Sequence, residues 1–440
     1  MSVNAALEPK LVLEPTDALN DEPISVRLQG LQPGQQATIK AVLRNDDSSV
    51  RWTGEIAVAA DDAGVVDLAT QAPISGSYTS VDPNGLLWSL SPEAGTAGGR
   101  SAADGLNPLT LELTALVDSV AVARAEAIRR PVDPSVTIRQ IRENGIFVNL
   151  FLPQEEAPLP SVVVLGGSGG GFSDGLAALY ASHGYAAISV AYFGIEGLPP
   201  ELLNIPLEYF EGVFEWIRAQ PEFDLEHLSI SGTSRGGELA LLLASRYPIF
   251  KSVATYVPSG YIWGAVSRAE DNDPNAFPSW TYGGEPIPYV DRIRNDAVEP
   301  NADGVLELTP AFLRALENEE RATAGAIEIE KINGPILMVS GRADALWPSA
   351  TFADLIVERL KSKGFAHEVR NFTYEGAGHT IGPRFGPATV TKGFHPIRKA
   401  TIGYGGNPAD IAAARFDSWP RVLAFLDQYV KTPSRAATVR

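Results

Sequence analysis

Three residues of this chain have the types and the order that nucleophilic catalysis requires: Ser234, Asp344 and His379. A serine hydroxyl is a weak nucleophile, so it needs a general base, and that base needs a carboxylate to orient it. Ser234 is the centre of Gly-Thr-Ser-Arg-Gly, residues 232–236. This G-x-S-x-G spacing is typical of a sharp strand-to-helix turn, in which the glycines leave room for the two elements to approach. A turn of small residues without a chemical role has the same pattern, so the rest of the chain must decide.

Asp344 and His379 each follow a predicted strand. The apolar run at residues 336–339 predicts a strand, and Asp344 lies in the loop after it; residues 368–372 predict another, and His379 follows it in a glycine-rich loop. A loop aspartate is most often a helix cap or a solvated carboxylate. Three suitable residue types in the order Ser, Asp, His, each after a separate strand, instead favour a triad of the α/β-hydrolase kind. We expect Ser234 to be the nucleophile, His379 the base and Asp344 its orienting acid.

The other histidines stand in less favourable places. His183 and His227 precede predicted strands, His367 opens one, and His395 lies in a late segment that reads as irregular. We expect structural roles for all four.

A serine nucleophile also needs two main-chain N–H groups that stabilise an oxyanion. The amide of Arg235, directly after the nucleophile, is the first expected donor. The second is expected from Ser168 or Gly169, in the glycine run 166–171 that follows an early apolar strand. A glycine run can also bind phosphate, but no Gly-Lys-Ser/Thr follows and no G-x-G-x-x-G opens a helix. His, Asp and Glu show no metal-ligand spacing, so we expect neither a cofactor nor a metal.

Alternating apolar strands and amphipathic helices predict the element that positions these residues. After a hairpin at 136–142 and 146–152, strands are expected at 162–165, 187–190, 228–231, 253–257 and 336–339, with helices at 207–218, 239–247 and 419–430. Continuous apolar strands indicate a mostly parallel sheet covered on both faces. The expected fold of residues 133–440 is therefore a doubly wound α/β domain of the α/β-hydrolase type. Residues 259–331, rich in Pro, Asp and Asn, are expected to form an irregular excursion over the active site, with one clear helix at 310–317.

The first 132 residues have a different pattern of apolar and polar residues. Apolar and polar residues alternate at 24–29 and 109–115, and turn signals such as Asp82-Pro83-Asn84-Gly85 separate the runs. This pattern predicts an all-β domain of the immunoglobulin-like sandwich type.

Composition limits the possible partners. A chain of 440 residues is long enough for two domains, and it has no cysteine for disulfides or thiolate chemistry. The net charge of −18 disfavours nucleic acid and anionic membranes, because their phosphates are repelled over most of the surface. The N-terminal residues lack the pattern of a signal peptide, no apolar run is long enough to span a bilayer, and the C-terminal Arg-Ala-Ala-Thr-Val-Arg is not a peroxisomal address. We therefore expect a cytoplasmic protein with a small-molecule substrate and no membrane insertion; the oligomeric state stays open.

Several longer stretches resemble one family, the acyl-CoA thioesterases and bile acid-CoA:amino acid N-acyltransferases. The resemblance covers nearly the whole chain, and its most specific parts are Gly-Leu-Leu-Trp-Ser-Leu at 85–90, Gly-Thr-Ser-Arg-Gly-Gly-Glu-Leu-Ala at 232–240, and Tyr-Glu-Gly-Ala-Gly-His at 374–379. The resemblance implies the same roles for Ser234, His379 and Asp344. It also implies a distinction: relatives with cysteine at the nucleophile position resemble the amino-acid conjugating transferases, whereas serine goes with thioester hydrolysis.

The resulting prediction is a serine hydrolase that cleaves an acyl-CoA to the free acid and CoA through an acyl-serine intermediate. An acyl-serine ester is less reactive toward amines than an acyl-cysteine thioester, so water takes the acyl group. A carboxylesterase, a lactonase or an amide hydrolase with the same triad is the main alternative. An acyl-CoA:amino acid N-acyltransferase comes third, and a binding protein on an inactive hydrolase scaffold comes last.

Overall fold

The computed structural model describes residues 8–47, 49–93, 105–267, 277–291, 293–294, 296, 298–383, 386–395 and 397–431. Backbone contacts divide the chain into two compact units. The first comprises residues 1–133 together with 384–390, and the second comprises residues 134–383 and 391–440.

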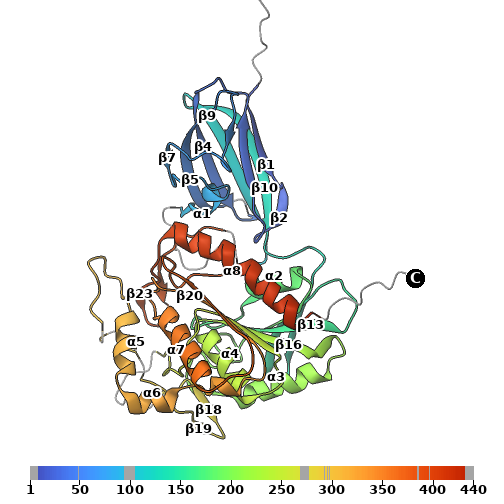
Figure 1. The fold of residues 1–440 in the computed structure, drawn as a ribbon. Helices are drawn as coiled ribbons and strands as arrows, with labels where there is room; N and C mark the ends of the chain where they lie inside the picture. Colours follow the sequence, from blue (N-terminus) through green and yellow to red (C-terminus); the bar gives the residue numbers. More distant parts are fainter. Residues whose placement is uncertain are drawn as a thin grey trace, which may run out of the picture. The chain divides into compact units, whose positions relative to one another are not determined.

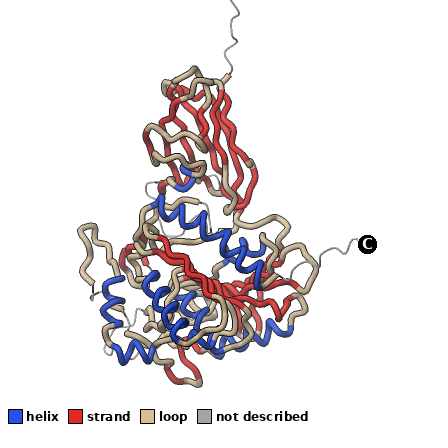
Figure 2. The backbone as a smooth tube through the Cα atoms, viewed as in Figure 1, coloured by secondary structure: helices blue, strands red, loops and turns tan. Residues whose placement is uncertain are grey.

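Nearly all of the regular secondary structure of the first unit is β-strand (Figure 2). One sheet has the order β1-β3-β6, and the other has the order β2-β10-β9-β4-β5-β7, with β8 paired to β5. A one-turn helix, α1, precedes β8. The strands are β1 Lys10–Glu14, β2 Asp17–Leu19, β3 Ser25–Gln29, β4 Gln36–Arg44, β5 Val50–Ala59, β6 Val66–Asp67, β7 Ser75–Gly76, β8 Ser91–Pro92, β9 Leu109–Val117 and β10 Val120–Arg130, and α1 spans Gly85–Trp88.

Alternating burial along the strands places the core of this unit between its sheets. In β4 every second residue is buried, and in β9 the first four odd positions are buried in the same way. The first sheet contributes the buried side chains of Leu11 and Leu13. A strand that hides one face and exposes the other has this pattern because its side chains alternate in direction. The all-β prediction for this region is confirmed, apart from the single turn of α1.

A short segment from late in the chain completes the first unit. The Ala388 N–H donates to the Trp88 carbonyl at 2.8 Å, and the Thr389 hydroxyl donates to the Leu90 carbonyl at 2.6 Å. The sequence did not predict that these residues would belong to the first unit.

The second unit is built on one sheet of eight strands, with the order β11-β12-β14-β13-β16-β17-β20-β21 (Figure 1). The two pairings at the β11 edge are antiparallel and all others are parallel. Its strands are β11 Thr137–Glu143, β12 Ile146–Leu152, β13 Leu159–Leu165, β14 Ala186–Val190, β16 Phe223–Thr233, β17 Ser252–Tyr256, β20 Ile336–Gly341 and β21 Val369–Tyr374. β14, β17 and β20 are buried along their full length, as expected for strands covered on both faces.

Helices cover both faces of this sheet. On one face α2 and α8 pack together, with the rings of Tyr180 and Trp419 5.4 Å apart; α3, α4 and α7 lie on the other face (Figure 1). The helices are α2 Asp174–Ser182, α3 Glu208–Ala219, α4 Arg235–Arg246, α7 Ser349–Ser362 and α8 Pro408–Tyr429. The predicted doubly wound, mostly parallel architecture is confirmed.

The excursion between β17 and β20 has more regular structure than the sequence predicted. The expected helix is α5, Thr309–Leu316, but a second helix, α6, follows at Glu319–Gly325, and a 3-10 turn, η3, at Ile329–Lys331. The prediction of one clear helix is therefore wrong. The side chain of Asn318 accepts a hydrogen bond from the Arg321 amide and so caps α6. The short strands β15 Ile205–Pro206, β18 Trp280–Tyr282 and β19 Glu285–Pro286 form a small separate sheet.

A final hairpin lies between β21 and α8. It consists of β22, Lys392–His395, and β23, Ala400–Gly403, paired antiparallel. The Leu306 amide donates to the Thr401 carbonyl at 2.9 Å, and the Gly403 amide donates to the Leu306 carbonyl at 2.9 Å, so main-chain hydrogen bonds fix the hairpin to the excursion. None of the helices in the described ranges is long and apolar enough to cross a membrane.

Candidate active site

Ser234 lies on the turn between β16 and α4, with φ of 59° and ψ of −122°. Few L-residues adopt this backbone conformation, so the surrounding structure must hold it. A Cβ atom on Gly232 would lie 2.1 Å from the Gly236 carbonyl oxygen, and one on Gly236 would lie 2.4 Å from the Gly166 carbonyl oxygen. Both glycines are therefore required for the close approach of strand, helix and neighbouring loop. The G-x-S-x-G interpretation of this turn holds in detail.

The structure brings Ser234, His379 and Asp344 together as a hydrogen-bonded chain. His379 Nε2 lies 2.9 Å from Ser234 Oγ, and His379 Nδ1 lies 2.8 Å from Asp344 Oδ2. The Asp344 side chain is fully buried and that of His379 is 10% exposed. With Nδ1–H donating to the carboxylate, Nε2 has a lone pair available for the serine proton.

The loop after β20 holds the Asp344 carboxylate in place. Its Oδ1 accepts hydrogen bonds from the amides of Leu346 and Trp347, at 3.0 and 3.2 Å, which leaves Oδ2 for His379. The His379 amide donates to the Tyr404 carbonyl at 2.7 Å, and the Trp347 ring packs edge-on against the imidazole with 5.9 Å between centroids. Both partners of the serine are thus fixed by main-chain hydrogen bonds.

The three candidate oxyanion residues take different positions. Arg235 is the first residue of α4, so its N–H is one of those that a helix leaves without an internal acceptor. Ser168 lines the same pocket as Ser234. Gly169 is exposed to solvent. Beside them, a Cβ on Gly167 would lie 3.4 Å from Ser234 Cβ, so the glycine run passes directly against the nucleophile. Of the two expected second donors, Ser168 lines the pocket and Gly169 does not, and the identity of the second donor stays a prediction.

The Arg235 side chain forms a buried ion pair. Its Nη1 lies 2.9 Å from Glu238 Oε2, and the two side chains are 5% and 0% exposed. Arg235 also donates to the Trp263 carbonyl at 2.8 Å and to the Ser279 hydroxyl. Glu238 accepts from the Trp280 indole N–H at 3.0 Å. Burial raises the pKa of the Glu238 carboxyl, although the Arg235 charge acts in the opposite direction.

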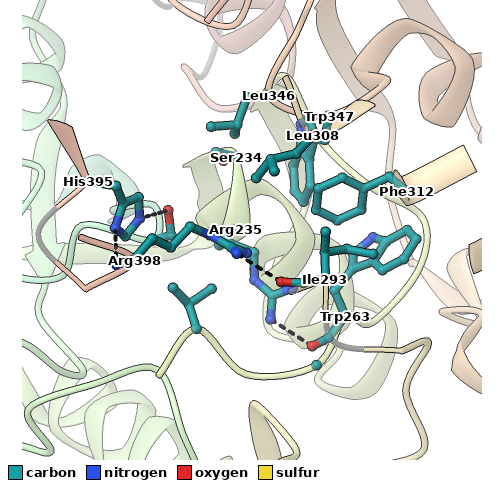
Figure 3. Close-up of a pocket in the computed structure, with 13 residues that line it drawn as sticks. Ser234, Arg235, Trp263, Ile293, Leu308, Phe312, Leu346, Trp347, His395 and Arg398 are labelled. Carbon is teal, nitrogen blue, oxygen red and sulfur yellow. Dashed lines mark hydrogen bonds between the residues drawn. The ribbon is translucent and has the colours of Figure 1, made fainter. Parts of the chain in front are cut away.

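The pocket beside Ser234 has two chemically different walls (Figure 3). On one side the aromatic rings of Trp263, Phe312 and Trp347 stand together, with the Trp263 and Phe312 centroids 4.6 Å apart. On the other side lie His395 and Arg398, from the hairpin β22–β23. This wall is apolar, and two of its members, Trp263 and Phe312, come from the segment 259–331.

His395 is the residue that sequence reasoning missed. It lies on β22 rather than in an irregular segment, and its Nε2 is 3.3 Å from Ser168 Oγ. The strand is only four residues long, and no local pattern showed that its His395 lines the pocket of Ser234. The other three histidines have structural contacts: His183 packs on Trp419, His227 pairs with Asp224, and His367 packs on Phe365. Among the described residues, no group of three His, Asp or Glu side chains could hold a metal ion.

The sheet order, the strained serine after β16 and the order Ser, Asp, His along the chain define an α/β-hydrolase. Two family models match the sequence: "BAAT / Acyl-CoA thioester hydrolase C terminal" over residues 205–432, and "Acyl-CoA thioester hydrolase/BAAT N-terminal region" over residues 21–143. The chain belongs to this acyl-CoA thioester hydrolase/BAAT family.

Known relatives match over nearly the full length. Acyl-coenzyme A thioesterase 1 of Mus musculus is 31% identical, over 95% of this chain and 96% of its own. Acyl-coenzyme A thioesterase 2, mitochondrial, of the same organism is 30% identical, over 94% of this chain and 88% of its own. Peroxisomal succinyl-coenzyme A thioesterase of Mus musculus is 28% identical, over 97% of this chain and 98% of its own.

Solved structures are more distant. A putative dienelactone hydrolase from Klebsiella pneumoniae has a TM-score of 0.41 and 16% identity, and the match covers 67% of this chain and 98% of that one. The acylaminoacyl peptidase of Pyrococcus horikoshii has a TM-score of 0.44 and 13% identity, and the match covers 94% of this chain and 76% of that one.

Proposed function

We propose that this protein hydrolyses acyl-CoA thioesters to the free acid and CoA. The observation that carries the proposal is the hydrogen-bonded chain Ser234–His379–Asp344 beside a pocket with one apolar wall. Two relatives that match over 95% and 94% of the chain are acyl-coenzyme A thioesterases by name, which supports this substrate class.

The first half-reaction forms an acyl-enzyme. His379 Nε2 accepts the proton of Ser234 as Oγ attacks the thioester carbonyl carbon, and Asp344 stabilises the imidazolium that forms. The main-chain N–H groups of Arg235 and Ser168 donate to the oxyanion of the tetrahedral intermediate. The intermediate collapses, the carbon–sulfur bond breaks, and the proton on His379 passes to the sulfur, so that CoA leaves as a thiol.

The second half-reaction transfers the acyl group to water. His379 takes a proton from a water molecule as its oxygen attacks the ester carbonyl, and the same N–H groups stabilise the new oxyanion. The bond to Ser234 Oγ then breaks, the serine regains its proton from His379, and the free acid leaves. Serine favours this outcome, because an oxygen ester is a poorer acyl donor to amines than a thioester is.

The direct test is thiol release from a panel of acyl-CoAs, from acetyl to palmitoyl with branched and aromatic members, beside matched p-nitrophenyl esters. We expect a clear preference for CoA thioesters, and a loss of several powers of ten in Ser234→Ala. Activity confined to the esters would overturn the substrate class while leaving the triad in place. Near wild-type turnover by Ser234→Ala would overturn the mechanism.

A second arm of the test concerns the acceptor. The same acyl-CoA is incubated with glycine or taurine, and the products are identified by mass spectrometry. We expect free acid alone; an N-acyl amino acid as the main product would make the protein a transferase. Labelling of Ser234 by a fluorophosphonate would exclude a binding protein on an inactive scaffold.

The compartment remains a prediction. The sequence favours the cytoplasm, whereas two of the relatives are mitochondrial and peroxisomal by name. Fractionation of cells that make the protein from its own gene, followed by immunoblotting, decides this point.

A further inference from the structure

His395 lines the pocket but takes no part in the two proposed half-reactions. His395 lies across from the aromatic wall, and its Nε2 is 3.3 Å from the hydroxyl of Ser168 (Figure 3). Ser168 is the residue whose main-chain N–H is the proposed second oxyanion donor.

The contacts of His395 define which ring nitrogen carries the proton. The Arg398 main-chain N–H donates to His395 Nδ1 at 3.3 Å, so Nδ1 is the acceptor and Nε2 carries the hydrogen. Nε2 therefore donates to Ser168 Oγ. Burial, and to a smaller extent the Arg398 charge, lowers the pKa of His395 to about 4, so the ring is neutral near pH 7 and keeps this tautomer.

Ser168 is the only residue with a side chain in the run Gly166–Gly171. Glycine has more backbone freedom than any other residue, so such a run needs external contacts to hold one conformation. Its ends have them: the Tyr192 hydroxyl donates to the Gly166 carbonyl at 2.6 Å, and the Gly171 amide donates to the Phe193 carbonyl at 2.8 Å. Between those ends, the Ser168 hydroxyl offers the one side-chain group by which the turn can be held.

We propose that His395 is a positioning residue that holds Ser168, and with it the second N–H donor of the oxyanion hole, in the orientation that catalysis needs. The hairpin that carries His395 is suited to this, because main-chain hydrogen bonds tie it to Leu306 and the Arg398 side chain donates to the Ile293 carbonyl at 2.8 Å. The inference rests on the proposed function only for the identity of the thioester. The oxyanion hole itself serves any acyl or phosphonyl transfer to Ser234.

The test compares His395→Ala, His395→Gln, Ser168→Ala and the double variant His395→Ala/Ser168→Ala. The first readout is the second-order rate constant for labelling of Ser234 by a fluorophosphonate; the second is kcat and KM for the best acyl-CoA. We expect His395→Ala to lower the labelling constant and kcat about 10- to 100-fold, with KM changed less than about threefold, because transition-state stabilisation depends on donor placement. His395→Gln, whose side-chain amide can donate to Ser168 Oγ, should recover most of the loss.

The double variant separates a shared role from two independent ones. If His395 acts through Ser168, then Ser168→Ala falls by a similar factor, and the double variant is no worse than the more impaired single variant. Three outcomes would each overturn the proposal. The first is a double variant whose fold-loss equals the product of the two single fold-losses; the others are wild-type rates in His395→Ala and a loss confined to KM. His227→Ala, which removes a histidine whose Nδ1 lies 2.7 Å from Asp224 Oδ2, is the matched control, and we expect wild-type rates from it. If His395→Ala does not fold, as judged by circular dichroism, then His395→Gln and Ser168→Ala decide: wild-type labelling by Ser168→Ala would overturn the proposal.

The two readouts keep this inference apart from the proposed function. If no acyl-CoA is hydrolysed but labelling depends on His395 as described, the substrate class fails and the positioning role stands. If acyl-CoAs are hydrolysed and labelling ignores His395, the positioning role fails and the function stands.

Discussion

The two carboxylate oxygens of Asp344 have different partners. One accepts hydrogen bonds from the loop amides, and the other accepts from His379. The substitution Asp344→Asn separates them. Its Oδ1 can still accept from Leu346 and Trp347, but its amide nitrogen donates toward Nδ1 and so imposes the wrong tautomer on the imidazole. We expect kcat to fall by about three to four powers of ten, as in other triads.

Thermal unfolding followed by circular dichroism provides the control for this variant. Because the loop amides keep their acceptor, the midpoint should stay within a few degrees of wild type. A variant that retained a tenth of the wild-type kcat would show that Asp344 is not the orienting acid.

The neutral His395 makes folding sensitive to acid. The unfolded chain takes up a proton at this histidine near its ordinary pKa of 6.5, whereas the folded protein does so only at about 4. Between these values the unfolded state binds more protons, so stability falls as the pH falls. From pH 7 to pH 5 the wild type should lose about 1–2 kcal/mol more than His395→Gln, measured by urea unfolding. Equal losses in both proteins would mean that His395 is not held neutral.

At the scale of elements, the buried pair of Arg235 and Glu238 joins α4 to the excursion. Glu238→Ala leaves the buried guanidinium without its carboxylate, and we expect it to lower the free energy of unfolding by about 3–5 kcal/mol. Urea unfolding at pH 7.5 measures this loss.

A double variant tests whether charge compensation is the cause. In Arg235→Met/Glu238→Gln both charges are gone, and glutamine can still accept from the Trp280 indole. The Trp263 carbonyl keeps the Ser279 hydroxyl as a donor at 2.8 Å. We expect at least half of the lost stability to return; if the double variant is less stable than Glu238→Ala, the hydrogen bonds and not the charges hold the two elements together.

The sheet and its serine could be predicted because their signals are local. Buried parallel strands appear in the sequence as continuous apolar runs, and the glycines around Ser234 record the backbone contacts at that turn. Asp344 and His379 could be found because each follows such a strand in the order that the fold requires. Even α6 has a local signal, a capping asparagine followed by two glutamates.

The features that escaped prediction depend on contacts between distant parts of the chain. His395 is 227 residues from Ser168, and nothing near it in the sequence reports that contact. The same holds for Ala388, whose partner Trp88 is the last residue of α1 in the first unit. Periodicity describes which face of an element is buried but not what covers it, so such pairs need the folded molecule.

At the scale of the whole molecule, net charge acts on the substrate before it binds. A protein with a net charge of −18 repels polyanionic CoA, and salt screens that repulsion. We expect kcat/KM for an acyl-CoA to rise about two- to tenfold between 10 and 150 mM salt, whereas the value for an uncharged p-nitrophenyl ester should stay constant. A fall with salt for the acyl-CoA would show that a local cationic surface, with Arg398 as one member, dominates its approach.

At Ser234, the residue that catalysis requires is not the residue that would give the most stable fold. Serine is held at a φ of 59°, which glycine adopts with much less steric strain. A protein with glycine at this position should therefore be more stable. Ser234→Gly and Ser234→Ala both lack the hydroxyl, and their comparison isolates the backbone: we expect the glycine variant to be about 1–2 kcal/mol more stable in urea unfolding. Equal stability would mean that the turn is not strained. A screen of variants for heat resistance alone would therefore tend to recover dead enzymes at this position, and such a screen needs activity as a second criterion.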